Sequence, residues 1–393
     1  MKNLKLLLAL ISVFLIVITG CKKDIRQEQR TDSVEVESSL KKFSPKQLHQ
    51  IVTSLPEGSE KRFRKNLDRF LELHPEYRQA VLRALKVSDA STCNENTNIN
   101  LWLDQQLSDW NDDVILLAIY TGMLDFPTYD ALFFENSSSD QQFGVNGEFS
   151  QRAEKTFKDL KRFWDIQTNN LVLGAMHGSM LMDKERVIRI DKILYGDSQA
   201  DAEYWADLIV ELMNNVPQYR HGDHPIFTFN AFAQSGFNFP PYGAIPPKII
   251  LGDGILEGLA AIGYKDVSTQ AVLAHEFGHH IQFQLGLYGN EVTPEATRKN
   301  ELMADAFSAY YLSHARGASM QWKRVKQFLQ VFFNIGDCQF NDVGHHGTPA
   351  QRMAAAEWAY SVADNAQKQG HILSSRQFVQ LFEAAYPSIL AHK

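Results

Sequence analysis

The sequence is poor in cysteine and has no basic run beyond its N-terminal segment. The formal net charge is −7, and an acidic chain without a basic patch lacks the electrostatic footprint that nucleic acids require. Nucleic acid is therefore excluded as an expected partner. Only three cysteines occur in 393 residues. Cys93 and Cys338 could form a disulfide in an oxidising compartment or be buried separately, and the sequence leaves both readings open.

The sequence also lacks a long apolar run. The run Leu6–Ile18 is somewhat shorter than a helix that spans a bilayer comfortably. It follows Lys2 and Lys5 and precedes the small residues Thr19-Gly20. A basic N-terminal segment, a short apolar core and small residues before the cleavage site are typical of a secretory signal peptide. The alternative is an uncleaved membrane anchor.

The end of this segment, Ile18-Thr19-Gly20-Cys21, resembles the processing site of bacterial lipoproteins. The resemblance implies that residues 1–20 form a signal peptide and that Cys21 carries lipid. Such an anchor would hold the chain on a membrane of the bacterial cell envelope, because each buried methylene contributes about 0.8 kcal/mol. Lys22 follows Cys21 and would be the second residue of the mature chain. A lysine at this position resembles lipoproteins that are sent to the outer membrane. Residues 21–43 are mostly polar and are predicted to form a flexible tether.

The remaining length, with an apolar content of 44%, suffices for one large or two smaller folded units. Apolar residues recur at helical spacing between Ser44 and Val87, so residues 44–148 are predicted to form an N-terminal helical region. Within it, the apolar run Val114–Tyr120 could be a buried helix or a buried strand. A polar loop with two glycines precedes residues 149–393, which are expected to form a second domain.

Residues 149–393 are predicted to be α+β, mostly helical with a small sheet. Amphipathic spacing predicts helices at Phe149–Trp164 and Ala200–Asn215. A turn is predicted at Asp183-Lys184. Short apolar runs predict strands at Leu171–Gly174, Val187–Ile190, Ile226–Phe229 and Lys248–Leu251.

The stretch Val272–Gln282 contains the pattern His-Glu-x-x-His. If it is helical, His275 and His279 lie one turn apart on one face, where two imidazoles can ligate one zinc ion. Glu276 lies beside them and is the expected general base for the attacking water. Gly278 costs about 1 kcal/mol in a helix relative to alanine. Either the helix that follows approaches this glycine closely, or the glycine is accidental.

A hydrolytic zinc site takes three protein ligands and leaves a fourth position for water. The helical-looking run Asn300–Tyr311 offers Glu301 and Asp305 four residues apart, on one face. Their neighbours are apolar, and buried carboxylates need a cation or hydrogen-bond donors. Glu301 is therefore the predicted third zinc ligand. Asp305 is predicted to accept the second N–H of a ligand histidine.

The pattern His275-Glu276-x-x-His279 followed by Glu301-x-x-Ala304-Asp305 resembles the gluzincin zinc metallopeptidases. The stretches Asn230–Ala233, Lys248–Leu251 and Gly254–Leu256 look like the strand pair before the metal helix in minigluzincins. His279–Gln282 and His346–Arg352 look like the bacterial neutral zinc metallopeptidase family. This resemblance extends from about Phe227 to Arg352.

The resemblance implies a zincin-like domain that binds Zn²⁺ and hydrolyses peptide bonds in a protein or peptide substrate. It also implies that Lys248–Leu251 lies at a sheet edge and binds substrate by strand addition, an ordinary internal strand being the alternative. This chain departs from the pattern by a proline-rich insertion, Phe239–Tyr242. A second group must stabilise the oxyanion. His346 is the preferred catalytic candidate, and Arg352 and Tyr310 are alternatives.

A different class of function stays open. The chain could be a non-enzymatic envelope lipoprotein, a scaffold or a chaperone-like assembly factor, whose zinc site is structural. Glu276 argues against this alternative, because a structural zinc site has no use for a base beside the metal.

Overall fold

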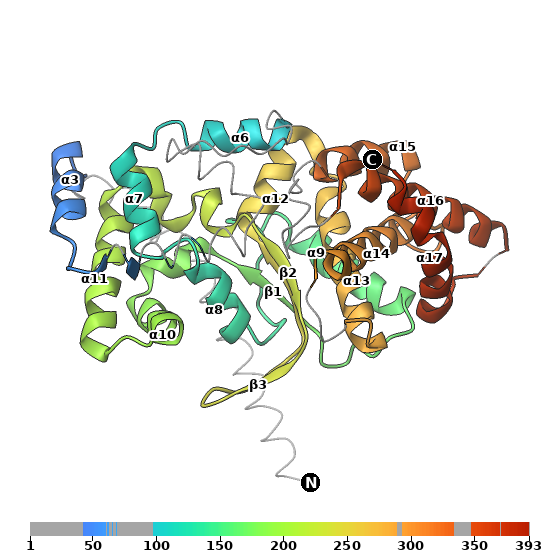
Figure 1. The fold of residues 1–393 in the computed structure, drawn as a ribbon, viewed down its shortest axis with the longest axis horizontal. Coiled ribbons are helices and arrows are strands. Elements are labelled where there is room, and N and C mark those ends of the chain that lie inside the picture. The colour runs from blue at the N-terminus through green and yellow to red at the C-terminus, as the bar shows by residue number, and fades with distance from the viewer. Residues whose placement is uncertain are drawn as a thin grey trace, which may run out of the picture. The chain divides into compact units, whose positions relative to one another are not determined.

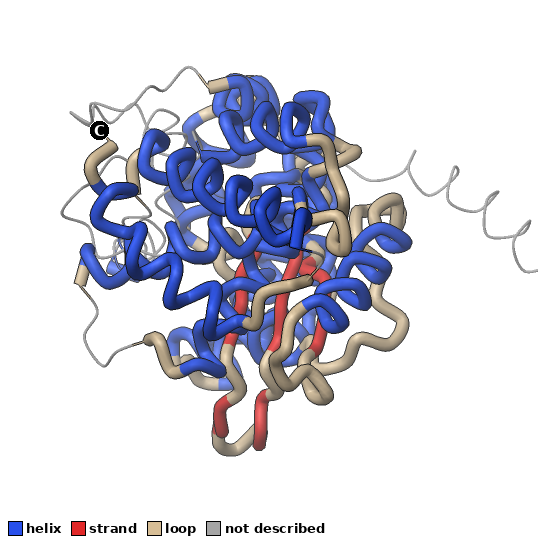
Figure 2. Tube along the Cα trace, turned by 90° about the vertical axis from the view of Figure 1, so that its right-hand side faces the viewer, coloured by secondary structure: helices blue, strands red, loops and turns tan. Residues whose placement is uncertain are grey.

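A computed structural model describes residues 42–59, 97–288, 293–333, 347–369 and 371–392, together with Lys61, Arg62, Lys65 and Asp68. These residues are mostly helical with a small mixed sheet, so the predicted α+β class is confirmed (Figures 1 and 2). None of the described helices combines the length and the apolar character needed to cross a membrane. The predicted signal peptide, almost all of the predicted tether, Cys93 and Cys338 lie outside the described residues.

The sheet has three strands, in the order β1 (Val172–Met176), β5 (Lys248–Gly252) and β2 (Ala231–Gln234). β1 runs parallel to β5, and β2 runs antiparallel to it. Every residue of β1 and β5 is buried, as expected for apolar strands that are covered on both faces. A second ladder pairs β3 (Phe237–Phe239) with β4 (Gly243–Ile245).

Helices surround this sheet on both sides (Figure 1). Those of the N-terminal part are α3 (Pro45–Ser54), α6 (Asn98–Gln106), α7 (Asp112–Tyr120) and α8 (Phe126–Phe134). The next are α9 (Ser150–Phe163), α10 (Lys184–Tyr195), α11 (Gln199–Asn215) and α12 (Asp253–Leu259). The last are α13 (Ser268–Leu285), α14 (Pro294–Ser313), α15 (Trp322–Phe332), α16 (Pro349–Gln369) and α17 (Ser375–Leu390). Short turns of other helix types are η2 (Gly178–Met182), η3 (Pro217–Gly222), η4 (Pro225–Thr228) and η5 (Ala260–Tyr264).

The described part of the N-terminal region is helical, as predicted, and the ambiguous run Val114–Tyr120 is a helix. α8 nevertheless packs against β1 and α10, which follow residue 148. Residues 45–393 form one compact unit. The division of the chain at residue 148 stays a prediction.

Two predicted strands are wrong. Val187–Ile190 lies in α10, where the side chain of Asp183 caps the helix by accepting hydrogen bonds from the first-turn N–H groups. Gly196, with φ +68°, ends the same helix. Asp183-Lys184, predicted from the sequence to be a turn between two strands, is therefore the start of a helix. The second stretch, Ile226–Phe229, begins in the turn η4, which Pro225 opens with its fixed φ.

Lys248–Leu251 forms a strand, as predicted, but the edge position that the resemblance implied for it is wrong. It is an internal strand, which was the alternative. β5 lies in the middle of the sheet, between β1 and β2, so its backbone groups face a partner on each side. β2 is one of the two outer strands, and it packs against α13, which carries the predicted ligands His275 and His279. An apolar run indicates that a strand is buried, but it does not distinguish a central strand from an edge strand.

The helices that carry the predicted ligands pack directly against each other. α14 contacts α13 and α16. A Cβ atom built on Gly278 of α13 would lie only 3.1 Å from the Cα of Ala304 in α14. The predicted close approach at this glycine is therefore confirmed. His280 follows in α13, and its Nε2 donates to the carbonyl oxygen of Lys248 at 2.9 Å, which fixes α13 to β5.

Candidate metal centre

The three predicted ligands meet between α13 and α14. The rings of His275 and His279 are nearly perpendicular, with centroids 4.9 Å apart. His275 Nε2 lies 3.3 Å from Glu301 Oε2, and His279 Nε2 lies 3.4 Å from Glu301 Oε1. In the part of the chain that the structure describes, this is the group of three histidine, cysteine or acidic side chains whose ligand atoms are close enough to share a metal ion. The His275–His279–Glu301 group can therefore hold a metal.

The spacing of these atoms allows them to share one ion, since one ligand atom from each residue lies within 4.8 Å of the others. With zinc–nitrogen and zinc–oxygen bonds of about 2.0–2.2 Å, neighbouring ligand atoms around a tetrahedral ion lie about 3.4 Å apart. Each imidazole nitrogen lies at about this separation from one Glu301 oxygen, His275 Nε2 at 3.3 Å from Oε2 and His279 Nε2 at 3.4 Å from Oε1. Two imidazoles and one carboxylate are three protein ligands, the number found in catalytic zinc sites.

The charges around His275 also favour a cation. The side chains of His275 and His279 are buried. Burial by itself lowers the pKa of His275, but the Asp305 and Glu301 carboxylates outweigh that effect and raise the pKa to about 10. The imidazole thus lies in a surplus of negative charge. A metal ion at Nε2 would balance that charge as a proton does.

The outer ring nitrogen of each histidine has its own partner. His275 Nδ1 lies 2.9 Å from Asp305 Oδ1, the partner predicted for a ligand histidine. His279 Nδ1 lies 3.0 Å from Gln282 Oε1 and 2.8 Å from the Tyr288 hydroxyl. These contacts fix the orientation of both rings, so that both Nε2 atoms face Glu301.

Sequence reasoning missed Gln282 and Tyr288. Gln282 lies three residues after His279 on the same helical face, so its spacing was a usable signal. Its Nε2 also donates to the carbonyl oxygen of Asn300 at 2.7 Å, which joins α13 to α14. Tyr288 follows Gly286, whose left-handed backbone ends α13 with φ +68°. No spacing rule predicts the path of the chain beyond such a residue.

Arg352 supports this centre from a third helix, α16. Its Nε and Nη2 donate to the two carboxylate oxygens of Asp305 at 2.7 and 2.8 Å, and both side chains are buried. Burial alone would raise the pKa of Asp305, but Arg352 and His275 hold it below its usual value. Asp305 is therefore ionised and able to orient His275. The guanidinium is committed to Asp305, which argues against its use as the oxyanion stabiliser.

The general-base candidate lies beside the ligands. Glu276 is 7% exposed and follows His275 in α13. Burial raises the pKa of Tyr288, and the charges of Glu301 and Glu276 raise it further.

The other catalytic candidates are not part of the described centre. His346 lies outside the described residues, and its role stays a prediction. Tyr310 is fully buried, and its hydroxyl accepts a hydrogen bond from the backbone N–H of Leu373 at 3.1 Å. It also packs against the rings of Trp164 and Phe378. These contacts make Tyr310 a core residue.

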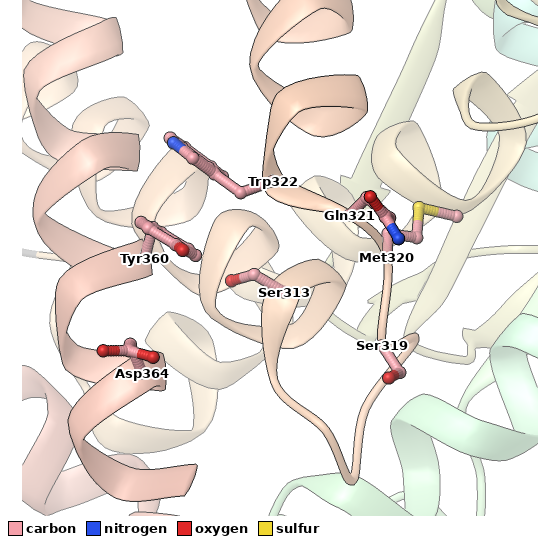
Figure 3. Close-up of a pocket in the computed structure, with 7 residues that line it drawn as sticks. All are labelled: Ser313, Ser319, Met320, Gln321, Trp322, Tyr360 and Asp364. Atoms are coloured by element: carbon pink, nitrogen blue, oxygen red, sulfur yellow. The ribbon is translucent and has the colours of Figure 1, made fainter. Parts of the chain in front are cut away.

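One open pocket lies at the C-terminal end of α14, near Ser313 (Figure 3). Its volume is about 250 Å³, and Ser313 and Asp364 are among its lining residues. Trp322 lies flat on Tyr360 at its border, with ring centroids 4.4 Å apart. No ligand residue of the metal centre lines this pocket, so it adds nothing to the chemistry of His275, His279 and Glu301.

The chain matches no protein-family model, no curated protein and no solved structure.

Proposed function

We propose that the chain is a zinc-dependent endopeptidase that hydrolyses peptide bonds in proteins at the bacterial cell envelope. The observation that carries the proposal is the convergence of two imidazole Nε2 atoms on the Glu301 carboxylate, with the buried Glu276 next to His275. Imidazole nitrogens and a carboxylate oxygen are donors that suit Zn²⁺. The resemblance of these residues to the gluzincin pattern supports the same function.

Each residue of the centre has a task in this reaction. Zinc bound by the three ligands would polarise the substrate carbonyl and lower the pKa of water. Glu276 accepts the proton of the attacking water and passes it to the leaving amine. Asp305 and Gln282 keep the two imidazole rings in their orientation. Arg352 keeps Asp305 charged, so that it remains an acceptor for His275.

The outer edge of β2 supports a polypeptide as the substrate. Among the described residues, β2 pairs with β5 alone, so the backbone groups on its other side have no strand partner. An extended peptide binds such an edge by strand addition. Because α13 packs against β2, a peptide bound there lies close to the metal helix. β2 thus takes the role that the sequence had suggested for Lys248–Leu251.

The proposed location rests on the lipoprotein-like segment Ile18–Cys21. Lipid on Cys21 would anchor the mature chain to the envelope, and Lys22 favours the outer membrane. Incorporation of labelled fatty acid that is lost in Cys21→Ser would support this location. A wild-type chain that takes up no label would contradict it.

The function is tested with the purified mature chain, by measuring bound zinc by elemental analysis and cleavage of casein. Glu276→Gln is expected to keep one zinc ion per chain and to lose about 10²–10⁴-fold in cleavage rate, the usual contribution of a general base. Glu295→Gln is the matched control, because Glu295 is exposed in the first turn of α14. Bound zinc without Glu276-dependent cleavage would refute the proposal and favour the structural zinc site.

A further inference from the structure

Residues 235–247 form a hairpin arm that contains β3 and β4. Gln234 lies opposite Lys248 in the ladder of β2 and β5. Three residues after Gln234 on one side and three residues before Lys248 on the other, Phe237 lies opposite Ile245 in the ladder of β3 and β4. The two ladders therefore share one register and belong to one long hairpin. Pairing is interrupted where Pro246 and Pro247, which have no N–H, face the other strand.

This shared register makes β3 the continuation of the outer strand β2. In the described parts of the chain, β2 has β5 as its strand partner and β3 has β4, both on the same side of the hairpin. The opposite edge is thus open along Ala231–Phe239. At about 3.3 Å per residue, this edge is about 30 Å long, several times the length of one substrate residue. Figures 1 and 2 show the arm extending beyond the surrounding helices.

The arm begins at the level of the metal helix. His280, directly after the ligand His279, donates to the carbonyl oxygen of Lys248. Lys248 is opposite Gln234, the last residue of β2 before the arm. A peptide that lies along the outer edge of β2 next to α13 is therefore directed onto the arm within a few residues.

The arm is aromatic and uncharged. No charged side chain and no histidine occurs from Ala231 to Pro247. Its aromatic residues stack on α8: the rings of Phe239 and Phe133 are parallel at 4.5 Å, and Tyr242 meets Phe134 edge-on at 5.3 Å. Tyr242 is 43% exposed, and its neighbours at the tip are exposed as well. The residues of the arm favour apolar or aromatic side chains over charged ones, because they include no group that could pair with a charge.

We propose that the arm extends the peptide-binding edge and selects substrates that continue, beyond the scissile bond, as an extended, uncharged segment with apolar or aromatic side chains. The inference rests on the proposed peptidase function and adds the substrate class. The occupant is a segment of the substrate polypeptide, because the arm continues the open edge that lies beside the metal helix and carries no charge.

The test compares cleavage of three peptides by the mature chain. A six-residue core is taken from a mapped casein cleavage site. It is used alone, extended on both sides with Phe, Val and Ala, or extended with Glu and Asp. The apolar extension is expected to raise kcat/KM roughly tenfold over the core, since several added cross-strand pairs each contribute a fraction of the binding energy. The acidic extension is expected to give no gain.

In two variants of the arm, the ratio of kcat/KM for the apolar extension to kcat/KM for the core should fall to about one. One is Tyr242→Asp, which puts a charge at the exposed tip. The other replaces residues 235–247 by Asn-Gly, which joins Gln234 to Lys248 by a two-residue turn. Leu381→Asp is the matched control, because Leu381 is an apolar residue of α17 with 45% exposure. This control should keep the full gain.

The outcomes separate the two proposals. Equal kcat/KM for the core and the apolar extension in the wild-type chain would overturn the role of the arm while the peptidase function stands. No cleavage of casein or of any peptide would overturn the peptidase function itself. If Tyr242→Asp leaves the apolar gain intact but weakens binding to phosphatidylethanolamine–phosphatidylglycerol vesicles, the arm is a membrane contact and the inference is wrong.

Discussion

The metal centre and the hairpin arm differ in how their side chains are held. In the centre, Arg352 pairs with Asp305, Asp305 contacts His275, and His279 contacts Gln282, all of them buried. In the arm, uncharged rings stack on α8 and the tip is exposed. The proposed reaction needs ligand atoms at fixed positions, whereas the proposed contact with varied substrate segments needs accessible apolar groups. Changes in the centre should therefore cost far more than changes in the arm.

The largest effect is expected for Glu301→Ala. The change removes the carboxylate that faces both imidazole Nε2 atoms, so the remaining two histidines should not retain zinc through dialysis, and casein cleavage should be lost. Elemental analysis of the dialysed protein measures this effect. Glu295→Ala, on the same helix, is the control. A variant that keeps one tightly bound zinc ion would show that Glu301 is not a ligand.

A large loss of stability is expected for Arg352→Gln. The change leaves the Asp305 carboxylate buried without its cation, which typically costs about 3–5 kcal/mol. Urea unfolding of the metal-free protein measures the loss. Adding Asp305→Asn should restore part of the stability, because it removes the unpaired charge. Equal stability of wild type and Arg352→Gln would contradict a buried ion pair.

The same pair predicts a pH dependence with a definite sign. Arg352 and His275 lower the pKa of Asp305, so the folded state favours the ionised carboxylate. This stabilisation is present above the usual aspartate pKa of about 4 and is lost as the pH falls through the lowered value. The difference in unfolding free energy between wild type and Arg352→Gln should therefore narrow in acid. A gap that widens as the pH falls would contradict this assignment.

A moderate effect is expected for Gln282→Ala. The change removes one partner of His279 Nδ1 and the link to Asn300, and loss of such a supporting partner typically weakens metal binding about 10–100-fold. Competition with a chromophoric chelator measures the zinc affinity. Gln270→Ala, about three turns before Gln282 in α13, should leave the affinity unchanged. Equal affinities for both variants would mean that Tyr288 alone orients the ring.

The smallest effect on stability is expected for Tyr242→Ser. Its side chain is 43% exposed at the tip of the arm, and exposed substitutions usually change the free energy of unfolding by less than about 0.5 kcal/mol. Urea unfolding checks this value. A loss comparable to that of Arg352→Gln would show that the arm is part of the folded core, and the contrast between the two regions would disappear.

Local patterns predicted much of the centre and less of the sheet. His275, His279, Glu301 and Asp305 were found because helical spacing puts residues four apart on one face. The same reasoning failed at Val187–Ile190, where three apolar residues fit a strand or a helix and only the cap at Asp183 decides. It also failed for the position of β5, because burial of a strand does not reveal its neighbours.

The sequence by itself determined the candidate ligand types and their spacing within each helix, since both follow from the helical repeat and from side-chain chemistry. The close approach of Ala304 that explains Gly278 came from the structure. Only the tertiary structure decided that Glu301 meets both imidazoles, that Arg352 holds Asp305, and that β3 continues the outer edge of β2. These relations join residues far apart in the chain. They depend on which surfaces pack together, and no local rule encodes that choice.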